Sequence, residues 1–192
     1  MPGESSPPGP APLPDPWVVR GTREVYANPW IRVREDDVLR PDGTPGIYGV
    51  VELRTRCLGA VPLLSDGSTM LVGQHRYTLG EWTWEVPQGG GAMDADPLAE
   101  IERELREETG LAARRWTSLG PVLVSNSVTD ERGLLWLAED CVQGVAAPEP
   151  SEQLLSWRLP LADAVAMALD GRVSDSVSVA ALLRADALVR TR

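Results

Sequence analysis

Three closely spaced glutamates, Glu104, Glu107 and Glu108, stand out in this sequence. On a helix of about 100° per residue they lie next to one another, at the border of an apolar arc. Three crowded carboxylates repel one another and require cations, and hard oxygen ligands suit Mg²⁺ or Mn²⁺, which also bind substrate phosphates. The alternative is a solvated helix face held by ion pairs, because Arg103 lies four residues before Glu107. The pattern therefore indicates either a divalent-metal site or an exposed charged helix.

The helix that must carry these acids is predicted over residues 97–109. Asp96 is a suitable N-cap, Pro97 suits the first helical position, and Gly110 is placed to end the helix. The apolar arc, which we expect to pack on a sheet, consists of Leu98, Ile101 and Leu105.

Short apolar segments on both sides of this helix predict strands. They span residues 31–39, 47–57, 59–64, 70–77, 82–86, 116–124, 134–139 and 154–159. Turn signals separate the early segments at Pro41-Asp42-Gly43, Asp66-Gly67 and Gly89-Gly90-Gly91. Two helical patterns follow, over residues 161–169 and 174–190. Strands around one central helix, with helices at the end, predict a mixed α/β or α+β sandwich.

The composition indicates one domain over residues 17–192, after a proline-rich tail over residues 1–16 that we expect to be disordered. The net charge of −10 argues against a nucleic-acid partner. No apolar run is long enough to span a membrane and no signal peptide is recognisable, so we expect a cytoplasmic protein. Cys57 and Cys141 are expected to be free thiols, and His75, the single histidine, argues against a histidine-based metal site or catalytic triad.

Residues 89–111 resemble the Nudix box, G-x5-E-x7-R-E-U-x-E-E-x-G-U, in which U is apolar. The matching residues, counted from Gly89, are Arg103, Glu104, Leu105, Glu107, Glu108, Gly110 and Leu111. The resemblance extends from about Val18 to Leu183 and is closest to the ADP-ribose pyrophosphatase branch of the family. The stretches that carry it outside the box are Asn28-Pro29-Trp30, Pro41-Asp42-Gly43, Trp84-Glu85-Val86-Pro87, residues 72–77 and Leu159-Pro160-Leu161.

This resemblance implies a Nudix-type α/β/α sandwich with a mixed central sheet, preceded by an N-terminal antiparallel sheet segment within residues 17–57. In the branch, strands of this segment pair across a two-fold axis, which implies a homodimer. The implied reaction is hydrolysis of a nucleoside diphosphate derivative, such as ADP-ribose, with two or three Mg²⁺ (or Mn²⁺) ions. GDP-mannose, UDP-glucose and dinucleoside polyphosphates are alternative substrates, and a non-catalytic regulatory domain is an alternative function.

The family pattern also implies roles for the residues of the box. Glu104 and Glu108 would be the principal metal ligands, and Glu107 would bind a further ion. Arg103 would hold the acids in place. The backbone carbonyl of Gln88 would complete the metal site.

Four residues outside the box are also candidates. In the family a glutamate on the loop before the last sheet strand is the general base, and the alignment places Glu152 there, with Glu149 as the second choice. Arg76 is a candidate for binding a substrate phosphate, because a guanidinium can bind phosphate bidentately. The alternative for Arg76 is an ion pair. Glu85 would assist at the site as a substrate-binding residue, or it is a buried structural acid.

Two positions depart from the family pattern. Ala95 stands where the box has its first glutamate, so we expect weaker support for Arg103. Asn126, within Ser125-Asn126-Ser127, stands where the ADP-ribose branch carries a proline, which bears on the choice of substrate. Several tryptophans are available to stack on a base, among them Trp17, Trp30, Trp82 and Trp84.

Overall fold

The computed structural model describes residues 9, 11, 13–148 and 153–192. The described residues before Trp17 are exposed and belong to no helix or strand. The predicted disorder of the tail over residues 1–16 stays a prediction, because most of that tail lies outside the described residues.

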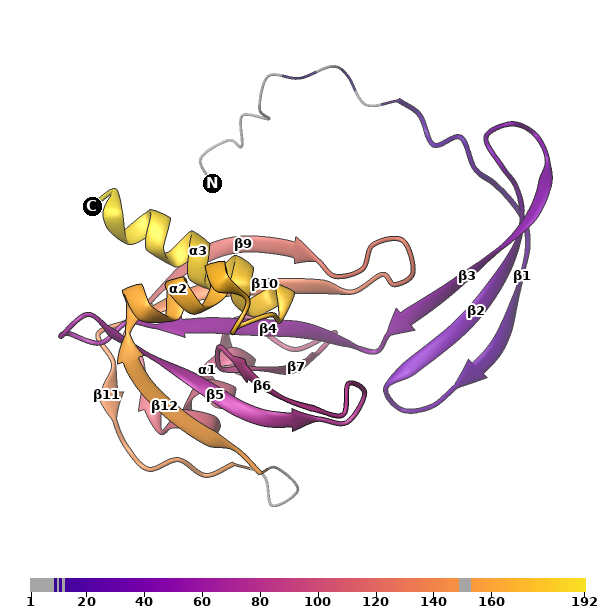
Figure 1. The fold of residues 1–192 in the computed structure, drawn as a ribbon. Coiled ribbons are helices and arrows are strands. Elements are labelled where there is room, and N and C mark those ends of the chain that lie inside the picture. The colour runs from indigo at the N-terminus through magenta and orange to yellow at the C-terminus, as the bar shows by residue number, and fades with distance from the viewer. Residues whose placement is uncertain (1–8, 10, 12, 149–152) are drawn as a thin grey trace.

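An antiparallel sheet of three strands forms the N-terminal part of the molecule and projects from the body (Figure 1). Its strands, in spatial order, are β1 (Val18–Ala27), β2 (Ile31–Leu39) and β3 (Pro45–Leu53). Backbone bonds tie β3 to the loop that follows β9, since Val51 N donates to Val128 O at 2.9 Å. The Tyr48 hydroxyl donates to Ser127 O at 2.8 Å in the same region.

Two further sheets form the body. The central sheet has the order β7 (Gln88–Ala92), β4 (Thr55–Pro62), β10 (Arg132–Glu139) and β9 (Arg115–Leu123). It is mixed, because β4 and β10 are parallel while the other pairs are antiparallel. The antiparallel sheet has the order β12 (Leu155–Pro160), β5 (Ser68–Arg76) and β6 (Glu81–Glu85). A short pair is formed by β8 (Leu111–Ala112) and β11 (Val142–Gln143).

Helices cover both sides of these sheets. Figure 1 shows α2 (Leu161–Asp170) and α3 (Ser176–Arg190) on one side of β4 and α1 (Pro97–Thr109) on the other. The largest apolar cluster lies between the sheets and the α2–α3 pair, and two smaller clusters lie under α1. The predicted α/β/α sandwich with a mixed central sheet and an N-terminal antiparallel sheet is thus confirmed.

The ends of α1 follow the predicted capping residues. Asp96 accepts a hydrogen bond from Leu98 N at 3.1 Å, and Gly110 ends the helix in the left-handed region at φ 74°. Ile101 and Leu105 are fully buried, so the apolar arc packs on the sheets as predicted. This packing fixes which face of α1 carries the glutamates.

The structure differs from the sequence predictions at three places in the sheets. The single strand predicted over residues 47–57 is divided between β3 and β4, because the chain leaves the N-terminal sheet at Arg54 and enters the central one. Strand β1 was not predicted, since its residues are all exposed and it has no buried face. The glycines 89–91 form strand β7, paired with β4, rather than a turn.

Among the described residues, no helix is long and apolar enough to cross a membrane.

Candidate active site

The Arg103 guanidinium is surrounded by three carboxylates of α1. Its Nη2 lies 2.5 Å from Glu104 Oε1 and 3.3 Å from Glu100 Oε2, and its Nη1 lies 2.5 Å from Glu107 Oε2. Because Glu100 supplies the third carboxylate, Arg103 is well supported in spite of Ala95, and the expectation of weaker support was wrong. The ion pairs expected for a charged helix face are therefore present at two of the three candidate metal ligands.

The main chain at the start of β7 lies against Glu104 and Glu108, the two principal candidate metal ligands. Glu108 is only 4% exposed, and its Oε2 accepts a hydrogen bond from Gln88 N at 3.1 Å. A Cβ atom added to Gly89 would lie 2.6 Å from Glu104 Cγ, so the glycine is needed for this close approach. Gln88 and Gly89 thus adjoin the acids, as the resemblance implies. A metal bond from the Gln88 carbonyl stays a prediction.

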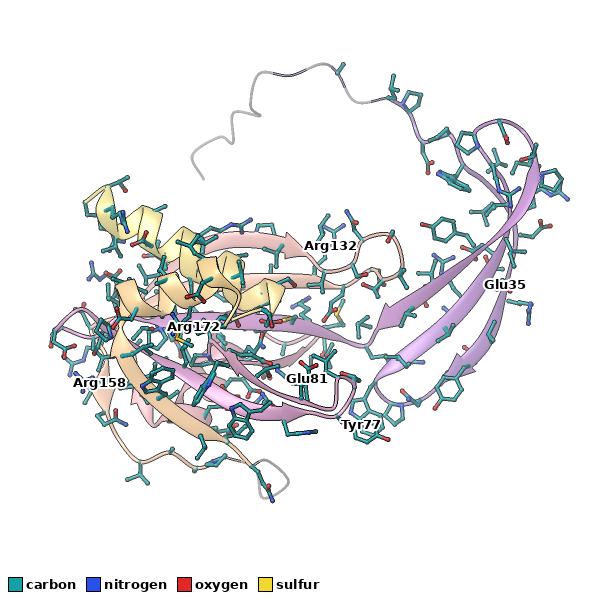
Figure 2. The ribbon with its side chains drawn as sticks, viewed as in Figure 1. Glu35, Tyr77, Glu81, Arg132, Arg158 and Arg172 are labelled. Carbon is teal, nitrogen blue, oxygen red and sulfur yellow. The ribbon has the colours of Figure 1, made fainter. Side chains whose placement is uncertain are left out.

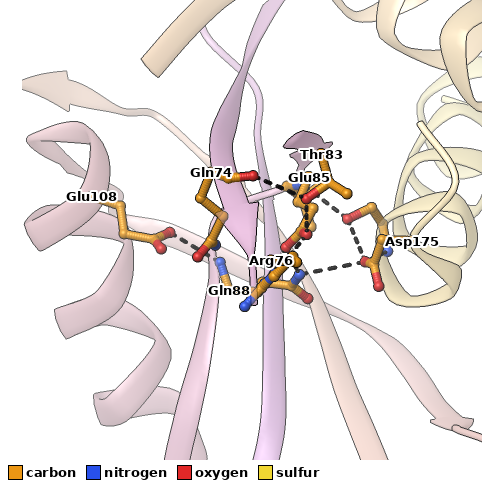
Figure 3. A network of polar contacts seen from close by, with 9 residues as sticks. Gln74, Arg76, Thr83, Glu85, Gln88, Glu108 and Asp175 are labelled. Atoms are coloured by element: carbon orange, nitrogen blue, oxygen red, sulfur yellow. Dashed lines mark hydrogen bonds and ion pairs between the residues drawn. The ribbon is translucent and has the colours of Figure 1, made fainter. Parts of the chain in front are cut away.

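A polar network continues from Gln88 toward the antiparallel sheet (Figure 3). The Gln88 side-chain amide donates to Glu85 Oε2, and Thr83 Oγ1 donates to Glu85 Oε1 at 2.6 Å. Arg76 binds the same carboxylate through both Nε, at 2.8 Å, and Nη2. Burial raises the pKa of Glu85, but these hydrogen bonds and the charge of Arg76 outweigh it, and the net pKa is lowered. Glu85 is therefore an ionised, buried acid, paired with Arg76.

The network ends at Asp175, the N-cap of α3 (Figure 3). Asp175 Oδ2 accepts from Ser178 N at 2.8 Å and from Ser178 Oγ at 2.7 Å, and it lies 3.4 Å from Gln88 Nε2. Ser178 Oγ accepts in turn from Val86 N at 2.9 Å. Sequence reasoning did not identify Asp175 as a site residue. The only sequence signal was local, namely an aspartate three residues before a serine at the start of a helix.

A cavity of about 340 Å³ adjoins this network. Its charged side chains are Arg56, Arg76, Glu131 and Asp175, and β7 contributes Gln88, Gly89 and Gly90. The other lining residues are Thr55, Cys57, Val124 and Val177. Because β7 also touches Glu104 and Glu108, the cavity lies beside the acids of α1.

The two acidic groups of the lining with raised pKa values are the Cys57 thiol and the Glu131 carboxyl. Burial, with a contribution from the nearby Glu131 and Asp175, raises the pKa of the Cys57 thiol to about 12. The thiol is therefore protonated at neutral pH and is not a nucleophile. Burial, together with the charges of Asp175 and Asp130, raises the pKa of Glu131. Sequence reasoning did not identify Glu131.

The remaining candidates are the proposed general base and the tryptophans. Glu152 and Glu149 lie outside the described residues, so the assignment of the general base stays a prediction. Trp82 and Trp84 stack edge to face on the antiparallel sheet, with ring centroids 6.1 Å apart. On the N-terminal sheet, Trp17 packs edge-on against Tyr48. Trp30 is largely exposed.

The acids of α1 fit a divalent cation by their chemistry. Glu104, Glu107 and Glu108 offer only carboxylate oxygens, which Mg²⁺ and Mn²⁺ prefer. Within the described ranges, no three acidic, histidine or cysteine side chains are grouped closely enough to hold a metal ion. Arg103 instead pairs with Glu104 and Glu107. Binding of an ion therefore requires these two side chains to turn a carboxylate oxygen toward the cation while they remain beside Arg103.

Two protein-family models match the chain. The model of the nucleoside diphosphate sugar hydrolase N-terminal domain matches residues 17–51. The NUDIX domain model matches residues 53–182. The boundary between the two matches falls where the chain passes from β3 to β4.

Curated relatives and a solved structure show similarity over most of the chain. An ADP-ribose pyrophosphatase of Mycobacterium tuberculosis is 31% identical over 166 residues, covering 81% of this chain and 76% of its own. A CMP-5'-(N-acetyl-N-hydroxy-3-aminopropyl)phosphonate hydrolase of Streptomyces rubellomurinus is 27% identical, covering 87% of this chain and 81% of its own. A crystal structure of an ADP compounds hydrolase has the same fold, with a TM-score of 0.79, 17% identity and coverage of 94% of this chain and 98% of its own.

Proposed function

The chain belongs to the NUDIX domain family, and on this premise we propose that it is a divalent-metal-dependent pyrophosphohydrolase of nucleoside diphosphate sugars, with ADP-ribose as the foremost substrate. The observation that carries the proposal is the meeting of the α1 acids with the start of β7, beside a cavity of about 340 Å³. The similarity to an ADP-ribose pyrophosphatase supports the choice of substrate.

In the proposed reaction, water attacks one phosphorus of the diphosphate, a P–O bond to water forms, and the anhydride P–O bond breaks. The products are a nucleoside monophosphate and a sugar phosphate. Two or three Mg²⁺ or Mn²⁺ ions, when bound, would neutralise the phosphate oxygens and acidify the water. Glu104 and Glu108 would hold them, together with Glu107 and the Gln88 carbonyl.

The other side chains would position the reactants. Arg103, already bound to Glu104 and Glu107, would keep these acids in place and offset their mutual repulsion. Glu152, or Glu149 as the second choice, would accept the proton of the attacking water.

Arg76 is proposed to bind a substrate phosphate at the cavity. Glu85 engages its Nε and Nη2 atoms, so the phosphate would be met by the remaining N–H groups. The buried Glu85 would assist by fixing the guanidinium rather than by touching the substrate.

A substrate screen tests this function. The full-length protein is incubated with ADP-ribose, GDP-mannose, UDP-glucose and a dinucleoside polyphosphate, with Mg²⁺, Mn²⁺ or EDTA, and nucleoside monophosphate is quantified by chromatography. We expect AMP and ribose 5-phosphate from ADP-ribose, released only with a divalent ion. Absence of monophosphate from every compound, with either metal, would overturn the proposal and favour a non-catalytic domain.

We also propose that two copies form a homodimer through the N-terminal sheet. This sheet projects from the body (Figure 1), and apolar side chains of β1, among them Val18, Val19, Val25 and Tyr26, are about half exposed. Figure 2 shows side chains of this sheet, including the labelled Glu35, extending away from the body. An exposed apolar sheet favours association, and identical copies associate most simply about a two-fold axis.

Light scattering coupled to size exclusion tests the assembly, and we expect a dimer at micromolar concentration. Val19→Glu and Val25→Glu together should shift the mass toward the monomer, because charges in an apolar interface are costly. The matched control is Leu169→Glu, an exposed apolar residue of α2 in the body. A wild-type protein that is monomeric throughout would contradict the proposal.

A further inference from the structure

The backbone of Gln88 is turned away from the neighbouring strand. Pro87 O accepts a hydrogen bond from Ala60 N at 3.0 Å. Gln88, the next residue, lies opposite Gly59 on β4. In an antiparallel ladder, alternate residues direct both the N–H and the C=O group away from the partner strand. The Gln88 N–H group accordingly donates to Glu108 Oε2, at 3.1 Å. The pairing with β4 therefore leaves the Gln88 carbonyl, the proposed metal ligand, without a partner in that strand.

The local sequence also does little to fix this carbonyl. The peptide group that carries it joins Gln88 to Gly89-Gly90-Gly91, where no side chain restricts the backbone. A metal ligand is effective only when it is held in the productive geometry by its surroundings. The orientation of the carbonyl therefore depends on the contacts that Gln88 makes outside the strand.

The side chain of Gln88 makes such a contact, because its amide group lies between two carboxylates (Figure 3). Its Nε2 atom donates to Glu85 Oε2 and lies 3.4 Å from Asp175 Oδ2. A primary amide has two N–H donors and no charge, so it can serve two acids at once. Glu85 is itself held by Arg76 and by Thr83. The amide thus links the start of β7 to β6 and to α3.

The α3 end of this link is firmly held. Asp175 Oδ2 accepts from both the backbone N and the Oγ of Ser178, at 2.8 and 2.7 Å. Ser178 is fully buried, and its Oγ accepts from Val86 N at 2.9 Å. Two contacts therefore join the beginning of α3 to the segment between Val86 and Gln88. Because α3 belongs to the largest apolar cluster, Asp175 is attached to a part of the molecule that does not move easily.

We propose that Asp175 is a positioning residue, which acts through the side-chain amide of Gln88 to hold the Gln88 carbonyl where a divalent ion binds beside Glu108. This inference rests on the proposed function and deepens it. It gives α3 a part in metal binding, in addition to the ligands that α1 and β7 would supply.

Gln88→Met tests the role of the amide. Methionine keeps the length of the side chain and the backbone carbonyl but has no donor. Electron paramagnetic resonance of Mn²⁺ on the full-length protein without substrate measures binding. We expect the dissociation constant of Mn²⁺ to rise roughly tenfold, the lower end of the range for a lost hydrogen bond to a charged group. The kcat for ADP-ribose should fall at low Mn²⁺ concentration and recover at saturating Mn²⁺. Unchanged Mn²⁺ affinity would overturn the inference.

Asp175→Ser tests whether α3 acts through that amide. Serine is as good an N-cap as aspartate, so α3 and the melting temperature should be retained, but its shorter side chain does not reach Gln88. We expect weaker Mn²⁺ binding, and no further loss when Asp175→Ser is added to Gln88→Met, because the two residues form one chain of contacts. Asp175→Asn keeps an acceptor oxygen of the same reach and should bind Mn²⁺ better than Asp175→Ser.

Asp186→Ser is the matched control, because Asp186 lies on the same helix and its side chain pairs with Arg190. We expect the control to bind Mn²⁺ as the wild-type protein does. Losses that add in the double variant would contradict the inference, since Asp175 would then act on the cation through its charge alone. Wild-type Mn²⁺ affinity in Asp175→Ser would contradict it as well.

Mn²⁺ binding also separates failure of this inference from failure of the proposed function, because it requires no turnover. If the wild-type protein binds Mn²⁺ but hydrolyses none of the compounds, while both variants bind Mn²⁺ more weakly, the proposed function fails and the role of Asp175 stands. If the protein hydrolyses ADP-ribose and all variants bind Mn²⁺ equally, the function stands and the role of Asp175 is overturned. A wild-type protein that binds no Mn²⁺ overturns the role of Asp175.

Discussion

Glu108→Gln lowers kcat for ADP-ribose at least a hundredfold while the protein remains folded. The proposed reaction needs cations held at α1, and the substitution removes one negative charge from their ligands without changing the size of the side chain. The glutamine carbonyl oxygen can still accept the hydrogen bond from Gln88 N, which Glu108 accepts at 3.1 Å. The fold should therefore survive, and the loss should appear in turnover.

Steady-state kinetics, circular dichroism and a thermal melt measure these two effects separately. Glu102→Gln is the matched control, because Glu102 is an exposed acid on the same helix. We expect that control to keep nearly full activity. Near-normal turnover of a folded Glu108→Gln variant would rule out Glu108 as a ligand of the essential metal.

Gly89→Ala is expected to lower kcat/KM for ADP-ribose by at least tenfold with little loss of stability. The new Cβ would lie 2.6 Å from Glu104 Cγ, closer than the two atoms can approach. The Glu104 side chain is flexible and can move aside, which makes the substitution tolerable for the fold. Its carboxylate would then leave the position beside β7 and Glu108, and the divalent ion would lose a ligand in the correct place.

The neighbouring glycine provides the control. A Cβ at Gly90 would approach Thr55 Oγ1 to 3.4 Å, which is an ordinary contact, so Gly90→Ala should retain activity. Neither glycine has a positive φ, so backbone strain does not distinguish the two variants. Electron paramagnetic resonance of Mn²⁺ would show weaker binding in Gly89→Ala alone. Equal activity of the two variants would show that the placement of Glu104 against β7 is unimportant.

The ion pairs of Arg103 show which contacts can be predicted from the spacing of residues along a helix. The pairing of Arg103 with Glu107 was readable from the sequence, because residues four apart are neighbours on a helix. The same rule at a spacing of three places Glu100 beside Arg103. Glu100 thus supplies by helix geometry a carboxylate for Arg103, although Ala95 stands where the family pattern has a glutamate.

Strand β7 shows where local patterns fail. Three successive glycines are typical of a turn, and nothing in their neighbours along the chain argues otherwise. They form a strand paired with β4, and at Gly89 and Gly91 neighbouring side chains lie so close that an added Cβ would collide: a Cβ at Gly91 would lie 2.5 Å from Leu58 Cδ1. That approach is a property of the packed molecule.

The sequence by itself determined the ends of α1, its buried face and the three acids beside that face, because capping and helical periodicity depend on residues within a few positions of one another. Only the tertiary structure decided that Arg76 pairs with Glu85, that Asp175 closes the network at α3 and that Glu131 lines the cavity. These residues come from distant parts of the chain, and no spacing along the sequence links them. Their meeting is set by the register of β5 with β6 and by the packing of α3 on the sheets, which depend on the burial of the whole core.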